Sequence, residues 1–311
     1  MIRIVRKIQL TNGKGIPISF PFYQERGRKM NHLKHEVIEI APKTWCLSEF
    51  RLVNAFLLEG KDKAALIDTG CGIGNLKNIV RELTEKPLVI LMTHGHFDHL
   101  GGIEQFEENI AYMHSKEKDM LEEMKSRLNC KDLNEMRAFY VKTRAPIRYP
   151  EANVEEILEL IPKETKMCWH TWENIEDGQM IDLGERQITA YHTPGHTEGS
   201  VCYLDETTRI LFSGDTVNHG IILQRQPDNG TELIEIYHQS IEKIWGKEKY
   251  FDRLAVGHDD ITIEKQMVKD YLELTEGLLD GTVTGNYEEI GFRKGDVARL
   301  RTAELWYQCD E

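Results

Sequence analysis

The motif T-H-G-H-F-D-H occupies residues 93–99 and directly follows the apolar run L-V-I-L-M at residues 88–92. In an extended chain, side chains two positions apart share a face, so His94 and His96 can reach one metal ion. Asp98 and His99 stand where the chain turns, and they can point toward a neighbouring ion. This single segment therefore offers four metal ligands.

Three later segments repeat the pattern of a strand followed by a polar ligand. Residues 188–191 lead to His196, residues 209–212 lead to Asp215, and residues 254–256 lead to His258. Because each ligand lies just after the C-terminal end of a strand, neighbouring strands could present the three side chains at one edge of a sheet. Glycines beside the ligands allow the backbone to approach closely.

Strand-like and helical patterns alternate along the chain. The expected strands are short, apolar and rich in β-branched residues, and they are residues 64–67, 88–92, 188–191, 200–204, 209–212 and 254–256. A stripe of apolar residues at helical spacing predicts a helix within residues 73–83, and another helix could begin at residues 103–106. The alternation indicates the α/β (or α+β) class.

We expect three parts along the chain. Residues 1–32 read poorly as the start of a domain, so we treat them as an N-terminal extension. Residues 33–262 form the expected catalytic domain, in which segment 115–180, dense in Glu, Lys, Met and Leu, predicts a mainly helical insertion. Residues 263–311 are expected to pack on the same domain as a helix, ended by Gly281, and a tail.

Composition limits the partners and the compartment. The chain has 311 residues, 40% of them apolar, which is ample for a packed core, and 52 Asp plus Glu against 39 Lys plus Arg give a net charge of -13. This charge would repel a phosphate backbone, so we expect no nucleic-acid partner. The six cysteines form no C-x-x-C pair, which suits reduced thiols in a cytosol.

The N-terminus has no continuous apolar region of the kind that a secretory signal requires, and no apolar run reaches transmembrane length. We therefore expect a cytoplasmic protein without a membrane partner. Its expected partner is a small-molecule substrate, and a homo-oligomer is possible.

The order and spacing of these motifs resemble the metallo-β-lactamase fold superfamily, in particular its glyoxalase II-like and lactonase-like hydrolases. H-x-H-x-D-H at residues 94–99 is followed by single His, Asp and His residues at the family's distances, and I-D-T-G at residues 67–70 matches the family's first motif. The resemblance spans about residues 37–260, apart from the insertion. It implies an αββα sandwich of two mixed β-sheets with helices outside.

The resemblance also implies a pair of metal ions and assigns their ligands. The first ion would be bound by His94, His96 and His196, the second by Asp98, His99 and His258, with Asp215 bridging both. Asp68 would steady the ligands by hydrogen bonding. We hypothesise that Asp98 also orients the attacking water or shuttles its proton.

The expected activity follows from these ligands. Imidazoles and carboxylates without thiolate suit two divalent ions, zinc foremost, with iron or manganese as alternatives. Two such ions sharing one water lower its pKa from 15.7 to roughly 7, which supplies hydroxide as a nucleophile at neutral pH. We therefore expect hydrolysis of an ester, thioester or lactone of a small molecule. A β-lactam is disfavoured, because true lactamases commonly carry cysteine at the position of Asp215 and lack the Asp98-His99 pair.

Two other activities remain open at this stage. A dinuclear centre could also serve a phosphodiesterase. An iron-dependent oxidoreductase similar to the family's persulfide dioxygenases is the alternative from a different class.

Four further residues are candidate substrate contacts. Asn218 stands where the family's lactonases carry a tyrosine, which counts against lactonase activity, and His219 follows it. Tyr140 and Arg144 lie four residues apart on one face of an expected helix.

For other polar residues we expect structural roles. His192 is expected to be a buried hydrogen-bonding residue, and the Glu- and Lys-rich run at residues 116–125 is expected to be a solvated helix face. The remaining histidines are not expected to bind metal, namely His32, His35, His114, His170 and His238.

Overall fold

A computed structural model describes residues 35–127, 130–163, 171–223, 230–290 and 293–307. The chain divides into two compact units, Met1–His32 and Leu33–Glu311, and the described residues all belong to the second. The N-terminal extension expected at residues 1–32 therefore lies outside the described residues.

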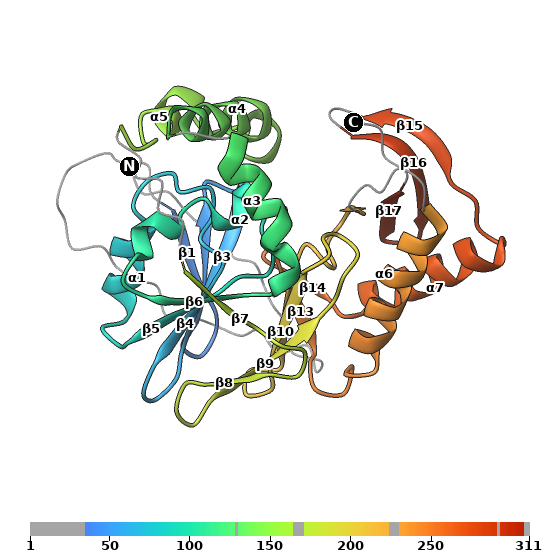
Figure 1. The fold of residues 1–311 in the computed structure, drawn as a ribbon, viewed down its shortest axis with the longest axis horizontal. Coiled ribbons are helices and arrows are strands. Elements are labelled where there is room, and N and C mark those ends of the chain that lie inside the picture. Colours follow the sequence, from blue (N-terminus) through green and yellow to red (C-terminus); the bar gives the residue numbers. More distant parts are fainter. Residues whose placement is uncertain (1–34, 128–129, 164–170, 224–229, 291–292, 308–311) are drawn as a thin grey trace. The chain divides into compact units, whose positions relative to one another are not determined.

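The first sheet has seven strands that follow one another in chain order (Figure 1). Its first four strands pair in antiparallel fashion, and they are β1 (Glu36–Ala41), β2 (Thr44–Glu49), β3 (Val53–Glu59) and β4 (Ala64–Ile67). The sheet continues in parallel through β5 (Leu88–Leu91), β6 (Ile110–Met113) and β7 (Trp172–Asn174). It is therefore a mixed sheet.

The second sheet has six strands in the order β14-β13-β11-β10-β9-β8. Its strands are β8 (Met180–Asp182), β9 (Gln187–His192), β10 (Val201–Asp205), β11 (Ile210–Gly214), β13 (Arg253–Val256) and β14 (Thr262–Glu264). Only β11 and β13 pair in parallel, so this sheet is mixed as well.

Successive side chains along a strand point to opposite faces of the sheet, and this alternation separates the inner core from the outer cores. Phe56 of β3 and Phe212 of β11 meet between the sheets, with ring centroids 5.2 Å apart. Neighbours of Phe56 in sequence face the opposite way and pack against α1 (Leu76–Leu83). Cys202 and Leu204 of β10 turn outward in the same manner.

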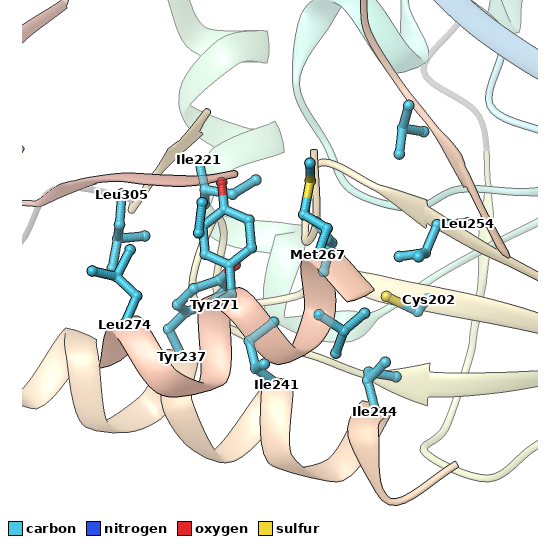
Figure 2. Close-up of a cluster of buried hydrophobic side chains, with 14 of the residues drawn as sticks. Cys202, Ile221, Tyr237, Ile241, Ile244, Leu254, Met267, Tyr271, Leu274 and Leu305 are labelled. Atoms are coloured by element: carbon cyan, nitrogen blue, oxygen red, sulfur yellow. The ribbon is translucent and has the colours of Figure 1, made fainter. Parts of the chain in front are cut away.

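Two C-terminal helices, α6 (Gly230–Trp245) and α7 (Gln266–Asp280), cover the outer face of the second sheet. Figure 2 shows Ile241 and Ile244 of α6 beside Met267 of α7 and Leu254 of β13. With helices outside both sheets, the expected αββα sandwich is confirmed.

The same apolar cluster also holds the loop after β11. Tyr237 of α6 donates a hydrogen bond from its hydroxyl to the Thr216 carbonyl at 2.8 Å, and Tyr271 of α7 donates one to the Asn218 carbonyl at 2.9 Å. The outer core therefore fixes the backbone that follows Asp215.

Among its described residues, the segment expected to be a mainly helical insertion, residues 115–180, is helical up to Leu158. Its helices are η2 (Ser115–Glu117), α3 (Lys118–Arg127), α4 (Cys130–Arg148) and α5 (Val154–Leu158). The last part instead supplies the short strands β7 and β8. These three-residue strands carry no apolar run, and therefore no strand was expected at either place.

The expected strands occur as β4, β5, β9, β10, β11 and β13, and the expected helix within residues 73–83 is α1. The helix that could begin at residue 103 is only the 3-10 turn η1 (Ile103–Phe106), because β6 starts four residues later. Gly281 ends α7 in the left-handed conformation, with φ of 79°, as expected.

The tail forms a third sheet that the sequence did not predict. β12 (Ile221–Ile222), β17 (Ala303–Tyr307), β16 (Arg293–Leu300) and β15 (Asn286–Ile290) pair in that order. Cys46, Cys71 and Cys202 are buried free thiols. Among the described residues, none of the helices has both the length and the apolar composition that a bilayer crossing needs.

Candidate metal centre

The motif at residues 93–99 lies between β5 and the single helical turn α2 (Phe97–Leu100). His96 precedes α2 with extended backbone angles, φ −66° and ψ 147°, so the chain turns where the sequence pattern required it. His94 and His99 are buried, whereas His96 and Asp98 are partly exposed.

The first predicted ligand set converges on one point. His94 Nε2 and His196 Nε2 each lie 3.0 Å from His96 Nδ1. The outer nitrogen of His196 donates a hydrogen bond to the Ile222 carbonyl at 2.7 Å, and that of His94 lies 3.0 Å from the Thr93 hydroxyl. This assignment of the ring protons leaves the inner nitrogens with free lone pairs.

The second predicted set also converges. His258 Nε2 lies 3.2 Å from His99 Nε2 and 3.2 Å from Asp98 Oδ2. The other ring nitrogen of His258 lies 2.8 Å from the Leu52 carbonyl and 2.9 Å from Arg148 Nη1, and these two contacts hold the ring with Nε2 toward the other ligands.

Asp215 lies between the two sets. Its Oδ2 is 3.6 Å from His196 Nε2 and 3.4 Å from His258 Nε2, and its Oδ1 is 3.6 Å from His99 Nε2. The structure therefore brings all seven predicted ligands together, with the carboxylate of Asp215 reaching both groups.

The chemistry of these donors fits divalent ions. Three groups of ligand atoms lie within 4.8 Å of one another: His94, His96 and His196; Asp98, His99 and His258; and His94, His99 and Asp215. A tetrahedral zinc ion with Zn–N bonds of about 2.0–2.1 Å separates its ligands by about 3.3 Å. The observed nitrogen separations are close to this value, and lone pairs that face one another repel unless a cation lies among them.

Asp68 supports this arrangement from just behind β4. It adopts a left-handed backbone, with φ of 60°. Its Oδ2 accepts hydrogen bonds from His99 Nδ1 and from the Thr93 hydroxyl, each at 2.8 Å, and its Oδ1 accepts one from the Thr93 amide at 2.8 Å. One carboxylate thereby orients His99 directly and His94 through Thr93, the geometry that a steadying residue needs.

Burial and charge set the protonation of the ligands. Burial lowers the pKa of His94 well below its ordinary value and that of His96 to about 3, so both rings are neutral, the form that binds metal. Burial opposes charge at Asp215 too, but His258 and His99 hold the pKa of that carboxyl well below its usual range. Burial also acts against charge at His99, yet Asp68 and Asp215 raise the pKa of that ring.

The insertion contributes Tyr140 and Arg144 as predicted neighbours of the site. The Tyr140 hydroxyl donates to Asp98 Oδ2 at 2.7 Å, and the Arg144 guanidinium lies 5.7 Å from the centre of the Tyr140 ring. Arg148, which the sequence reading missed, continues this stripe four residues later and donates to the Tyr140 hydroxyl at 3.3 Å.

The two other candidate substrate contacts differ from each other. Asn218 is 5% exposed and donates from Nδ2 to Asp215 Oδ1 at 3.3 Å, so it contacts the central carboxylate. His219 is exposed, and its Nε2 pairs with Asp260 Oδ2 at 2.7 Å.

Two expectations about polar residues hold only in part. His192 is only partly buried: it stacks on His114 with ring centroids 3.8 Å apart and hydrogen-bonds to the Glu198 carbonyl. Within the run at residues 116–125, Glu117 is 1% exposed and therefore lies in the interior. The local pattern of alternating charges gave no sign of this burial.

The other histidines have partners outside the ligand groups. His35 packs against Phe50, and His238 bonds to the Thr275 hydroxyl. His32 and His170 lie outside the described residues.

Comparison with known proteins agrees with the geometry. The family model of the metallo-beta-lactamase superfamily matches residues 49–258, about two thirds of the chain. The chain belongs to the metallo-β-lactamase superfamily.

Within this superfamily, the chain is similar to the acyl-coenzyme A thioesterase MBLAC2 of Homo sapiens, with 31% identity over 187 residues. That match covers 56% of this chain and 61% of the human protein, so it spans about three fifths of the relative's length. The probable metallo-hydrolase YqgX of Bacillus subtilis (strain 168) is 26% identical over 170 residues, which are 54% of this chain and 67% of that protein.

Solved structures of the superfamily share the fold. The sec-alkylsulfatase Pisa1 from Pseudomonas sp. gives a TM-score of 0.57 at 14% identity, covering 79% of this chain and 42% of that one. The DIM-1 metallo-β-lactamase gives a TM-score of 0.51 at 17% identity, covering 78% and 98% of the two chains.

Proposed function

We propose that this superfamily member is a metal-dependent hydrolase that cleaves a thioester, or a related ester, of a small molecule at a centre of two zinc ions. The observation that carries the proposal is the convergence of two three-residue ligand sets on either side of Asp215. The similarity to acyl-coenzyme A thioesterases favours a thioester among the carbonyl substrates.

The two ligand sets would hold two ions that could share one water, as catalytic two-metal sites do. His94, His96 and His196 would hold one ion, Asp98, His99 and His258 the other, and Asp215 both. Each ion would have three ligands of its own and a share of Asp215, so water and substrate would enter by expansion to five-coordination, which catalytic zinc sites undergo. When bound, two such ions lower the pKa of a shared water toward 7 and polarise the carbonyl that it attacks.

The protein's own groups hold the carboxylates of the centre in place. Tyr140 fixes Asp98 from one side, and Asn218 fixes Asp215. His258 and His99 overcome the effect of burial and keep the pKa of Asp98 well below its ordinary value. This low pKa supports an orienting role of Asp98 on the attacking water over a role as proton carrier.

The position of Asn218 supports a thioester over a lactone. The family's lactonases carry a tyrosine there to contact substrate, whereas Asn218 is buried and bonded to Asp215. The net charge of -13 supports a small-molecule substrate over a nucleic acid.

The test combines metal analysis with a substrate panel. We expect two zinc ions per chain and fastest turnover on acyl thioesters, compared with lactones, aryl esters and bis-aryl phosphodiesters. Asp215→Ala should lose both metal and turnover. A preference for phosphodiesters would contradict the proposal, as would one iron per chain with oxygen uptake on a persulfide.

A further inference from the structure

Glu117 is a buried carboxylate outside the predicted ligand sets. It ends η2, just after β6, and is 1% exposed. In the part of the chain that the structure describes, no basic side chain pairs with it. Burying a carboxylate costs several kcal/mol, and hydrogen bonds must offset that cost.

Three donors from two loops supply these hydrogen bonds. Oε2 accepts from the Gly95 amide at 2.9 Å, and Oε1 accepts from the Gly199 amide at 2.7 Å and from the Thr197 hydroxyl at 2.6 Å. Gly95 lies between His94 and His96 in sequence, and Thr197 follows His196. A single carboxylate thus joins the two loops that carry the first ligand set.

Both glycines leave the space that this carboxylate needs. A Cβ atom at Gly95 would lie 2.7 Å from Met120 Cε and 2.8 Å from Glu117 Oε2, and one at Gly199 would lie 2.6 Å from Glu117 Oε1. Separations below 3.0 Å are not tolerated by real Cβ atoms. The close approach therefore accounts for a glycine at the centre of H-G-H and another after His196.

The second ligand set is held by other groups. His99 is oriented by Asp68, His258 by the Leu52 carbonyl and Asp98 by Tyr140. Glu117 therefore hydrogen-bonds directly beside His94, His96 and His196, whereas Asp98 and His99 lie three and four residues beyond Gly95 on the same segment.

We infer that Glu117 is a positioning residue for the first metal-binding set, and that it acts by fixing the loops of His94, His96 and His196 against each other. The inference rests on the proposed dinuclear centre. It goes beyond that proposal because it predicts that a change at Glu117 alters the affinity for one ion and not for the other.

The test uses Glu117→Gln, which keeps the size of the side chain. The new NH2 group would face a hydrogen-bond donor of the loops, so at least one of the three hydrogen bonds would be lost. The metal-free full-length protein is titrated with zinc against a chromogenic chelator, and with cobalt while its absorption spectrum is recorded. Groups behind metal ligands typically change metal affinity 10–100-fold, so we expect a loss of about that size for one ion and a change within about threefold for the other. The exposed Glu107→Gln is the matched control and should bind both ions as the wild type does.

The weakened ion is assigned in variants that keep only one ligand set. With His258→Ala removing the second set, Glu117→Gln should weaken the remaining ion. With His196→Ala removing the first set, Glu117→Gln should leave the remaining ion unchanged. Glu117→Asp keeps the charge and should recover part of the lost affinity, which also provides a test if the Gln variant does not fold.

The outcomes distinguish a failure of the inference about Glu117 from a failure of the proposed function. If the wild type binds two ions and the folded Glu117→Gln variant binds both with unchanged affinity, or loses both equally, the inference is overturned and the proposed function stands. If the wild type binds no metal, the proposed function fails, and the inference fails with it.

Discussion

Tyr140 connects the helical insertion to the metal centre through one hydrogen bond. Its hydroxyl donates to Asp98 Oδ2 at 2.7 Å, and the same carboxylate oxygen lies 3.2 Å from His258 Nε2. Burial, and then the charge of Asp98, raise the pKa of Tyr140 well above its ordinary value. The phenol therefore remains a hydrogen-bond donor at neutral and moderately alkaline pH.

Tyr140→Phe keeps the ring and removes only this donor. We expect kcat/KM on the best substrate of the panel to fall about tenfold, equivalent to about 1.4 kcal/mol, because Asp98 loses the group that orients it. Steady-state kinetics measure the effect, and Tyr287→Phe on the exposed strand β15 is the control. Wild-type kinetics in Tyr140→Phe would show that the hydrogen bond has no part in catalysis.

Residues differ in how far their roles can be predicted from sequence. The cluster at residues 94–99 could be predicted because one short segment concentrates four potential metal ligands after a strand. Glu117 and Arg148 could not be found, because each depends on loops that come together only in the folded chain. The spacing of Tyr140, Arg144 and Arg148, four residues apart, was the one available signal for Arg148.

Elements could be predicted where both of their faces are buried. β4 is apolar throughout and β11 is apolar in its first three residues, and both were recognised, since each contributes to the packing on both sides of its sheet. β3, with the sequence V-N-A-F-L-L-E, carries a similar signal that the sequence reading passed over. β15 is mostly exposed and polar, so neither its period nor its composition distinguishes it from a loop.

Helix α4 is attached to the sandwich through a fully buried arginine. Arg137 donates from Nε to the Cys71 carbonyl at 2.8 Å, and from Nη2 to the Gly101 carbonyl at 2.8 Å and to Glu104 Oε1 at 2.9 Å. These contacts connect the helix that carries Tyr140 to the loops after β4 and α2. Arg137 lies on the buried side of α4, and it therefore holds in place the helix whose Tyr140 reaches Asp98.

Arg137→Ala should be strongly destabilising, because it leaves Glu104 and two buried carbonyl groups without their donor. We expect the free energy of unfolding in urea to fall by about 3–5 kcal/mol. Lys142→Ala, at an exposed position of the same helix, should change it by at most about 0.5 kcal/mol. Equal unfolding midpoints and slopes for Arg137→Ala and the wild type would refute the anchoring role.

At the scale of the whole molecule, motif order predicted the two-sheet sandwich but not the third sheet. The predicted ligands follow β5 of the first sheet and β9, β11 and β13 of the second. The sheet of β12, β17, β16 and β15 is built mainly from the tail, where no metal-binding residue marks the strand ends. Its assignment needs the pairing of β12 with β17, which lie far apart in sequence.

Each proposed metal site takes ligands from both sheets of the sandwich. His94 and His96 follow β5 of the first sheet, whereas His196 lies between β9 and β10 of the second. In the other set, Asp98 and His99 also follow β5, and His258 follows β13. Bound ions would therefore cross-link the two sheets at the edge of their shared core.

Removing the metal should consequently weaken the whole fold. A ligand at 1,000 times its Kd stabilises the native state by about 4.1 kcal/mol, so we expect a chelator to lower the free energy of unfolding by about this amount for each ion bound that tightly. The measurement is urea unfolding of the wild type with added zinc and with chelator. Asp215→Ala, which loses the carboxylate shared by both sets, should respond much less to zinc. A wild type whose unfolding is the same in zinc and in chelator would exclude metal cross-links between the sheets, because ions bound across that seam cannot leave without a loss of stability.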